Sequence, residues 1–185
     1  MTATNILVPL LSGFEELEAT TIVDVLRRAD LSVWLAADEP GPVRGAHNIR
    51  VVADKALARV SAKDLRAVVL PGGMPGAKNL AEHPIVQRLI AEVYKQGGYV
   101  AAVCAAPMAL AAAGVLAGKS ATCYPGFEKY LEGAKISENR VVVDGKVVTS
   151  RGPGTAQEFA LTLVGLLRDK NTETEVQEAL LTFRP

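Results

Sequence analysis

The stretch YVAAVCAAP at residues 99–107 decides how this chain folds. Five residues with strand character lead directly into Cys104, and the alanine-rich residues 105–113 favour a helix. Pro107 falls in the first turn of that helix, where the missing N–H of proline leaves no hydrogen bond unmade. A residue at such a strand-to-helix corner lies above the carboxyl edge of a sheet with its side chain exposed, as in a nucleophile elbow.

The position of Cys104 predicts a reactive thiol. Free amides and the dipole at a helix start stabilise a thiolate, and they can lower a cysteine pKa from about 8.5 into a range of roughly 3.5 to 7.5. The alternative is a buried structural cysteine, because the thiol is small and apolar enough for an alanine-rich core.

Length and composition indicate one globular domain over residues 1–185. Acidic and basic residues balance at 20 each, so no electrostatic feature favours nucleic acid or an anionic membrane as partner. We therefore expect a small neutral ligand or another protein surface. Cys104 and Cys123 form no C-x-x-C pair and no metal-ligand pattern with His47 and His83, so neither a metal nor a cofactor is expected, and a reducing cytoplasm fits best.

No targeting or membrane segment is expected. The apolar residues 6–11 are few and run into a Ser-Gly pair, so they indicate a first strand rather than a signal peptide. The weakly polar residues 99–118 are mostly alanine, and Pro107 and Gly114 interrupt them, which argues against a transmembrane helix.

Strands alternate with helices along the chain, which is typical of an α/β fold with a mostly parallel sheet covered on both faces. Strands are expected at residues 5–11, 31–37, 67–70, 99–103 and 120–123, and helices at 15–29, 77–81, 84–96, 105–113, 126–131, 154–168 and 172–181. A hairpin is expected at 140–150, and residues 43–52 form either a hairpin or a pair of short strands at the edge of the sheet. In the first helix we expect Leu17, Thr21, Val25 and Leu26 to form the apolar stripe. Function is expected at the carboxyl ends of the strands.

The first helix opens with three acidic residues. Compensation of the helix dipole explains Glu15 and Glu16 well. Glu18 lies one turn after Glu15 and within a step of Leu17 and Thr21, so periodicity allows it to face either the sheet or the solvent.

Two further strand ends carry unusual residues. Gly72 and Gly73 follow a buried strand, either as a plain turn or as a place where backbone amides point at a ligand. The amides of Gly73 and Ala105 together are candidates for an oxyanion hole, in which each donor is typically worth about 3 to 4 kcal/mol in the transition state. The stretch 150–155 leads through a glycine turn into a helix and brings Arg151 toward this edge.

These segments together resemble the ThiJ/PfpI superfamily, in the branch of the Parkinson-associated protein deglycase and its bacterial relatives. The resemblance rests on EELE at 15–18, VDVLRR at 23–28, VLPGG at 69–73, AVCAAP at 102–107 and TSRGPGT at 149–155. It implies a flavodoxin-like three-layer sandwich, a homodimer and Cys104 as a reactive thiolate. It also implies Glu18 as the carboxyl partner of the thiol and Gly73 with Ala105 as backbone donors.

The chain also departs from the patterns of this superfamily. Peptidases of the superfamily carry a histidine directly after the nucleophile, where this chain has Ala105, and no histidine follows Cys104 at all. Tyr124 stands where the animal deglycase branch has a histidine before a proline. Its phenol donates hydrogen bonds but is a poor base near neutral pH, since its reference pKa is about 10. His47 is expected to be either an exposed turn residue or an auxiliary group reaching the site across a dimer.

The expected function is that of a cysteine-dependent enzyme acting on small reactive carbonyls, of the glutathione-independent glyoxalase or protein deglycase type, in carbonyl and oxidative stress protection. Cys104 and Glu18 are the expected catalytic pair, Gly73 and Ala105 the oxyanion donors, and Gly72, Tyr124, Arg151 and His47 auxiliary groups. The alternative is a redox sensor or chaperone that uses the oxidisable Cys104. A cysteine peptidase or amidotransferase is disfavoured by the missing histidine.

Overall fold

The computed structural model describes residues 3–182; the remaining residues of the expected domain, 1–2 and 183–185, lie outside the described part. Its main sheet holds seven strands in the order β10 (Val141–Asp144), β11 (Val147–Ser150), β7 (Tyr99–Val103), β6 (Leu65–Leu70), β1 (Asn5–Pro9), β2 (Val33–Ala37) and β5 (Lys55–Ala56). Every pairing is parallel except that of β10 with β11. The expected α/β class with a mostly parallel sheet is confirmed.

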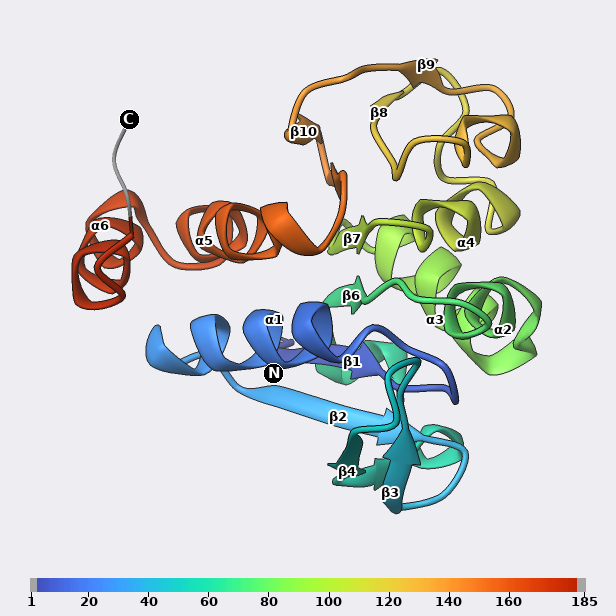
Figure 1. The fold of residues 1–185 in the computed structure, drawn as a ribbon, viewed down its shortest axis with the longest axis horizontal. Helices are drawn as coiled ribbons and strands as arrows, with labels where there is room; N and C mark the ends of the chain where they lie inside the picture. The colour runs from blue at the N-terminus through green and yellow to red at the C-terminus, as the bar shows by residue number, and fades with distance from the viewer. Residues whose placement is uncertain (1–2, 183–185) are drawn as a thin grey trace.

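Helices cover both faces of the sheet (Figure 1). One layer holds α1 (Glu16–Arg28), α5 (Ala156–Leu167) and α6 (Lys170–Ala179), and the other holds α2 (Gly76–Glu82), α3 (Pro84–Lys95) and α4 (Pro107–Ala112). Successive strand residues point to opposite faces, so Ala67 and Val69 join the core under α1 and α5, whereas Val68 and Leu70 join the core under α3 and α4. The fold is thus a three-layer sandwich with two apolar cores.

The strand order positions the site. From β1 the chain passes to β2 on one side and later returns to β6, on the other side of β1, and then to β7. Ligands of open α/β sheets bind at the carboxyl ends of the strands where the order reverses. The residues that follow β1, β6 and β7 therefore meet at one edge of the sheet.

The peripheral elements differ from expectation. The predicted hairpin at 43–52 forms, but β3 (Gly41–Arg44) and β4 (Arg50–Ala53) make a separate antiparallel sheet, and the short β5 occupies the edge instead. The strand predicted at 120–123 shrinks to β8 (Ser120–Ala121), which pairs with β9 (Lys135–Ile136) outside the main sheet. Strands of two residues carry too little periodicity to be recognised in a sequence.

Two helical predictions are also corrected. The helix expected at 126–131 is only a 3-10 turn, η3 (Glu128–Tyr130). The stripe expected on α1 is confirmed for Val25 and Leu26, which are buried, but Leu17 is 53% exposed, and Glu18 and Ile22 are fully buried instead. The remaining 3-10 turns are η1 (Leu57–Arg59), η2 (Ala62–Asp64) and η4 (Pro153–Thr155).

Candidate functional site

Cys104 lies at the corner between β7 and α4, where the sequence places it. Its φ of 63° falls in the left-handed region, which is rare and costly for a residue with a side chain. Two backbone hydrogen bonds hold this conformation, since Cys104 N donates to the Ser150 carbonyl at 3.0 Å and its carbonyl accepts from Tyr124 N at 2.8 Å. The nucleophile elbow is therefore built into the backbone, and the half-buried thiol stands at the carboxyl edge of the sheet.

Glu18 points from α1 into the same place. Its Oε2 accepts a hydrogen bond from the Gly72 amide at 2.6 Å, whereas its Oε1 is buried and has no hydrogen-bond partner among the described residues. A Cβ on Gly72 would lie 2.6 Å from Cys104 Cβ and 2.8 Å from Glu18 Oε2. Only glycine therefore lets the strand end, the thiol and the carboxyl meet.

Burial dominates the acidity of Glu18. Removal from water raises its pKa from 4.5 to about 7, the Gly72 amide and the Cys104 thiol oppose that rise, and the charge of Glu15 adds to it. Near neutral pH the carboxyl therefore exchanges a proton readily. Of the two orientations that the helical periodicity allows, Glu18 takes the buried one, and its raised pKa favours the protonated form.

The low pKa predicted for Cys104 is wrong. Burial and the negative charge of Glu18 raise its pKa to about 12, although the amides of Gly73 and Ala105 act in the opposite direction. A helix start alone favours a thiolate, but burial and the carboxylate beside the sulfur outweigh it. Because the two acids interact strongly, they titrate as a pair, and the pair holds one negative charge over a wide pH range.

The amides of Gly73 and Ala105 both act to lower the pKa of the Cys104 thiol, which indicates that they face its sulfur. Gly73 has φ 86°, and a Cβ there would lie 2.4 Å from the Glu15 amide nitrogen, so this position also requires glycine. Two amides converging beside a nucleophile provide the geometry for stabilising an oxyanion.

Tyr124 and Arg151 lie beside the site in different ways. Tyr124 contacts Cys104 through its backbone amide, while its half-exposed ring packs over Gly152. The charge of Arg151 acts on Cys123, whose pKa burial and Glu128 raise to about 11 and Arg151 lowers in part. Both cysteines are free thiols.

His47 lies in the turn between β3 and β4, with Glu15 and Glu16 as its partners. Its Nδ1 is 3.2 Å from a Glu15 oxygen and 3.1 Å from a Glu16 oxygen, and its side chain is 70% exposed. The His83 ring accepts a hydrogen bond from the Val86 amide and so caps the start of α3, which is a structural role. Both histidines therefore pair with carboxylates other than Glu18.

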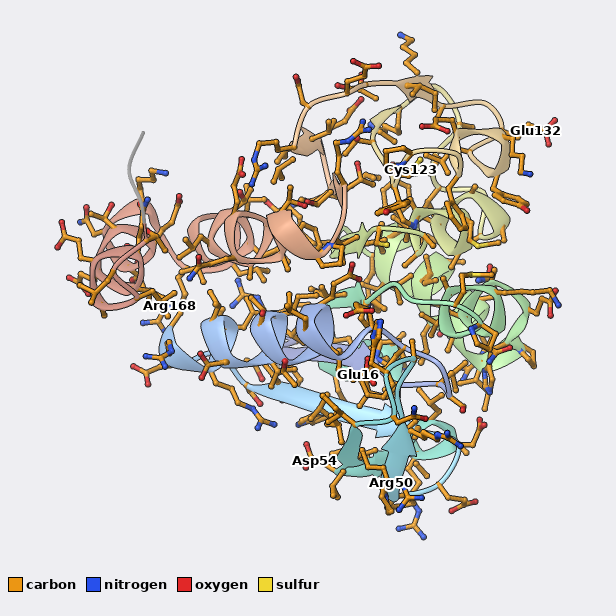
Figure 2. All side chains as sticks on the ribbon, in the orientation of Figure 1. Glu16, Arg50, Asp54, Cys123, Glu132 and Arg168 are labelled. Atoms are coloured by element: carbon orange, nitrogen blue, oxygen red, sulfur yellow. The ribbon has the colours of Figure 1, made fainter. Side chains whose placement is uncertain are left out.

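Sequence reasoning missed the role of Glu16. Burial acts to raise the pKa of Glu16, but hydrogen bonds from its own backbone, His47 and Ile49 outweigh burial and lower it. Its carboxylate joins the start of α1 to the β3–β4 turn, and Figure 2 shows Glu16 between these two elements. In the sequence, compensation of the helix dipole accounts fully for Glu16, so no sequence signal indicates its contact with the β3–β4 turn.

Glu15, Glu16 and His47 bring ligand-type atoms within 4.8 Å of one another. Both oxygens of Glu16 already accept hydrogen bonds from the turn, so we interpret the group as a hydrogen-bonded cluster and not as a metal site. In the part of the chain from residue 3 to residue 182, no helix combines the length and apolar character needed to cross a membrane.

Comparisons with known proteins agree with this architecture. Over 185 residues the chain is 41% identical to Protein DJ-1 homolog B of Arabidopsis thaliana, an alignment that covers 98% of this chain and 42% of that protein, so the chain spans less than half of that relative. It is 40% identical over 154 residues to the glutathione-independent glyoxalase DJR-1.2 of Caenorhabditis elegans, covering 83% of this chain and 82% of that protein.

Solved structures show the same fold. The crystal structure of Drosophila melanogaster DJ-1beta matches with a TM-score of 0.94 and 38% identity over 100% of both chains, which confirms the expected flavodoxin-like sandwich. Residues 4–166 match the DJ-1/PfpI family. The chain belongs to the DJ-1/PfpI family.

Proposed function

We propose that this protein is a cysteine-dependent enzyme that converts small reactive carbonyls to hydroxy acids, as a glutathione-independent glyoxalase or a deglycase, in protection against carbonyl and oxidative stress. The observation that carries the proposal is the Cys104 thiol beside a buried carboxyl, Glu18, whose pKa is raised to about 7. The glyoxalase name of the Caenorhabditis elegans relative supports it.

The first step joins the enzyme to its substrate. The Glu18 carboxylate takes the thiol proton as the Cys104 sulfur adds to the aldehyde carbon of methylglyoxal. The amides of Gly73 and Ala105 stabilise the oxyanion that forms, and a proton from Glu18 then completes the hemithioacetal.

The second step moves hydrogen between the two carbons. Glu18 removes the proton from the former aldehyde carbon and returns it to the former ketone carbon, while the hydroxyl proton passes to the second oxygen. The aldehyde carbon is thereby oxidised to a thioester and the ketone carbon is reduced to an alcohol, so no external oxidant is needed. Water then cleaves the thioester, releases lactate and restores the thiol. In an early glycation adduct, the carbonyl-derived carbon is the equivalent position for attack by the Cys104 sulfur.

Steady-state kinetics with methylglyoxal test the proposal, scored by lactate formed because loss of aldehyde also reports adducts with buffer. Cys104→Ser is expected to abolish lactate formation, whereas the matched change Cys123→Ser is expected to retain it. Glu18→Gln is expected to reduce turnover by a factor of about 100 or more, the usual size of an acid–base contribution. Equal lactate formation by wild type and Cys104→Ser would contradict the proposal.

A second candidate function is redox sensing. The buried Glu18 Oε1 has no partner among the described residues, and a protonated carboxyl there offers a donor to an oxidised Cys104 sulfur. A sensor or chaperone that reports oxidation of Cys104 remains the alternative proposal. Peptidase or amidotransferase chemistry is not proposed, because His47 pairs with Glu15 and Glu16 and His83 pairs with Asp38.

We propose a homodimer as the assembled form, as the family resemblance implies. Sedimentation velocity tests it, since a dimer of this 19.5 kDa chain is resolved from the monomer. A single species at the monomer mass over a wide concentration range would rule it out.

A further inference from the structure

The β3–β4 turn is docked on the start of α1 by a small set of polar contacts. The His47 amide donates to Glu16 Oε1 at 2.7 Å, and the Ile49 amide donates to the same oxygen at 3.1 Å. The Ala46 amide donates to the Phe14 carbonyl at 2.8 Å. These bonds hold the His47 ring against Glu15 and Glu16, although the turn itself lies on the surface.

Glu15 connects this turn to the catalytic pair. Its amide donates to the Gly72 carbonyl at 2.8 Å, and the amide of the same Gly72 donates to Glu18 Oε2 at 2.6 Å. The Glu15 side chain is only 14% exposed, and its negative charge acts on Glu18. One residue therefore contacts His47 with its carboxylate and the Gly72 strand end with its backbone.

We propose that His47 is a positioning residue whose positive charge, acting through Glu15, sets the pH at which the Cys104–Glu18 pair loses its first proton. The inference rests on the pair named in the proposed function but not on its substrate. When the imidazole is charged, it compensates Glu15, and Glu18 ionises more easily. When the imidazole is neutral, Glu15 acts on Glu18 without compensation and keeps it protonated to a higher pH.

Few charged or polar groups besides these acids act on His47 and Glu18. From α1, Glu16 and Glu15 face His47 and raise its pKa. From the hairpin itself, Arg44 is engaged with Asn48 at 2.7 Å, and Arg50 is exposed. Arg50 is the first residue of β4 after the turn, and Figure 2 shows it apart from Glu16. Besides burial, the pKa of Glu18 is affected by the Gly72 amide, the Cys104 thiol and the charge of Glu15.

The experiment measures the rate of iodoacetamide alkylation of Cys104 against pH, by intact-mass spectrometry in a Cys123→Ser background. Wild type is expected to show a first step centred near pH 7, because the pair must lose one proton before the sulfur reacts. His47→Gln is expected to move this step upward by about 0.3 pH unit or more, within the usual range for a partly exposed charge. His47→Arg, which keeps the charge, is expected to leave the step at the wild-type position or below it.

Two controls separate charge from structure. Arg50→Gln removes a positive charge from the same hairpin and is expected to leave the step unchanged. In a Glu15→Gln background the shift caused by His47→Gln is expected to shrink, because the connecting charge is gone. Equal shifts in the Gln and Arg variants would overturn the inference, as would a shift that persists in full without Glu15 or a His47→Gln step at the wild-type position.

Alkylation requires no turnover. Absence of lactate formation would therefore contradict the proposed enzyme function without touching this measurement. Conversely, an unchanged alkylation step in His47→Gln would remove the role of His47 even if the enzyme converts methylglyoxal.

Discussion

The Gly72 amide nitrogen lies 2.6 Å from Glu18 Oε2, and the same glycine leaves space for Cys104 by lacking a side chain. The hydrogen bond orients a carboxyl that would otherwise be buried without compensation, and the bare backbone allows the thiol to approach it. Gly72, at the end of β6, thus allows the Glu18 carboxyl and the Cys104 thiol to lie side by side. Their shared titration is the property from which the following predictions are argued.

The first prediction concerns how alkylation of Cys104 depends on Glu18. In wild type the rate is expected to rise through a step near pH 7 and then level off, since the pKa of Glu18 is raised to about 7 and the second proton leaves the pair only near 12. In Glu18→Gln the step near pH 7 is expected to disappear, because the pair no longer contains a titrating carboxyl. Cys123 is fully buried and serves as the slow internal control. Persistence of the step in Glu18→Gln would assign it to another group.

The second prediction concerns stability. The folded state holds the Glu18 proton more tightly than the unfolded chain, so its contribution is present below pH 4.5 and is lost as the pH rises through about 7. The shift corresponds to about 3 kcal/mol of unfolding free energy. Wild type is therefore expected to lose about that amount relative to Glu18→Gln between pH 4.5 and pH 8.

Urea unfolding of both proteins at several pH values measures this difference directly. The comparison cancels the titration of every group that does not interact with Glu18, because the two proteins differ at one position. Parallel stability profiles for the two proteins would show that Glu18 has an ordinary pKa in the folded state.

The third prediction concerns Gly72. Gly72→Ala places a methyl group 2.6 Å from Cys104 Cβ and 2.8 Å from Glu18 Oε2, so the thiol and the carboxyl must separate. A displacement of this kind is expected to reduce lactate formation by about 100-fold and to destabilise the fold by about 1 to 3 kcal/mol. Gly154→Ala is the matched control, because no atom lies within 4 Å of a Cβ at that position. Similar losses of lactate formation in both variants would contradict the steric argument.

The fold and part of the site are predictable from local patterns. Apolar runs ending at Cys104 and at the Gly72–Gly73 pair indicate strand ends, and parallel topology then brings those ends together. The burial of Glu18 does not follow from the sequence, because on α1 the periodicity of Leu17 fits an apolar stripe equally well. In the structure Leu17 faces outward and the Glu18 carboxyl faces inward, because the carboxyl accepts a hydrogen bond from the Gly72 amide, 54 positions away in sequence.

The acidity of the site was less predictable than its location. A helix start alone favours a thiolate at Cys104, but the buried carboxyl beside it reverses the sign. The link from His47 through Glu15 likewise depends on the docking of the β3–β4 turn, which no spacing in the sequence encodes. Charges that act across tertiary contacts require the structure.

The last prediction separates the sensor from the enzyme. A protonated Glu18 beside the sulfur can donate a short hydrogen bond to an oxidised Cys104, and its Oε1 has no competing partner among the described residues. In wild type, oxidation of Cys104 by mild peroxide is therefore expected to stop at the sulfinic acid. Intact-mass spectrometry at graded peroxide concentrations measures this. Glu18→Gln keeps a weaker donor and is expected to lose this preference in part, whereas Glu18→Leu is expected to lose it altogether.

Turnover measured on the same oxidised samples completes the test. Sulfinate formation consumes the nucleophile, so lactate formation is expected to fall in proportion to the sulfinate present. If Glu18→Leu accumulates the same sulfinate as wild type, the carboxyl is not what stabilises it, and the sensor proposal loses its physical basis. If lactate formation survives full oxidation of Cys104, the thiol is not the nucleophile, because the adduct of a sulfinate with an aldehyde is a sulfone that cannot become a hydrolysable thioester, and the enzyme proposal fails instead.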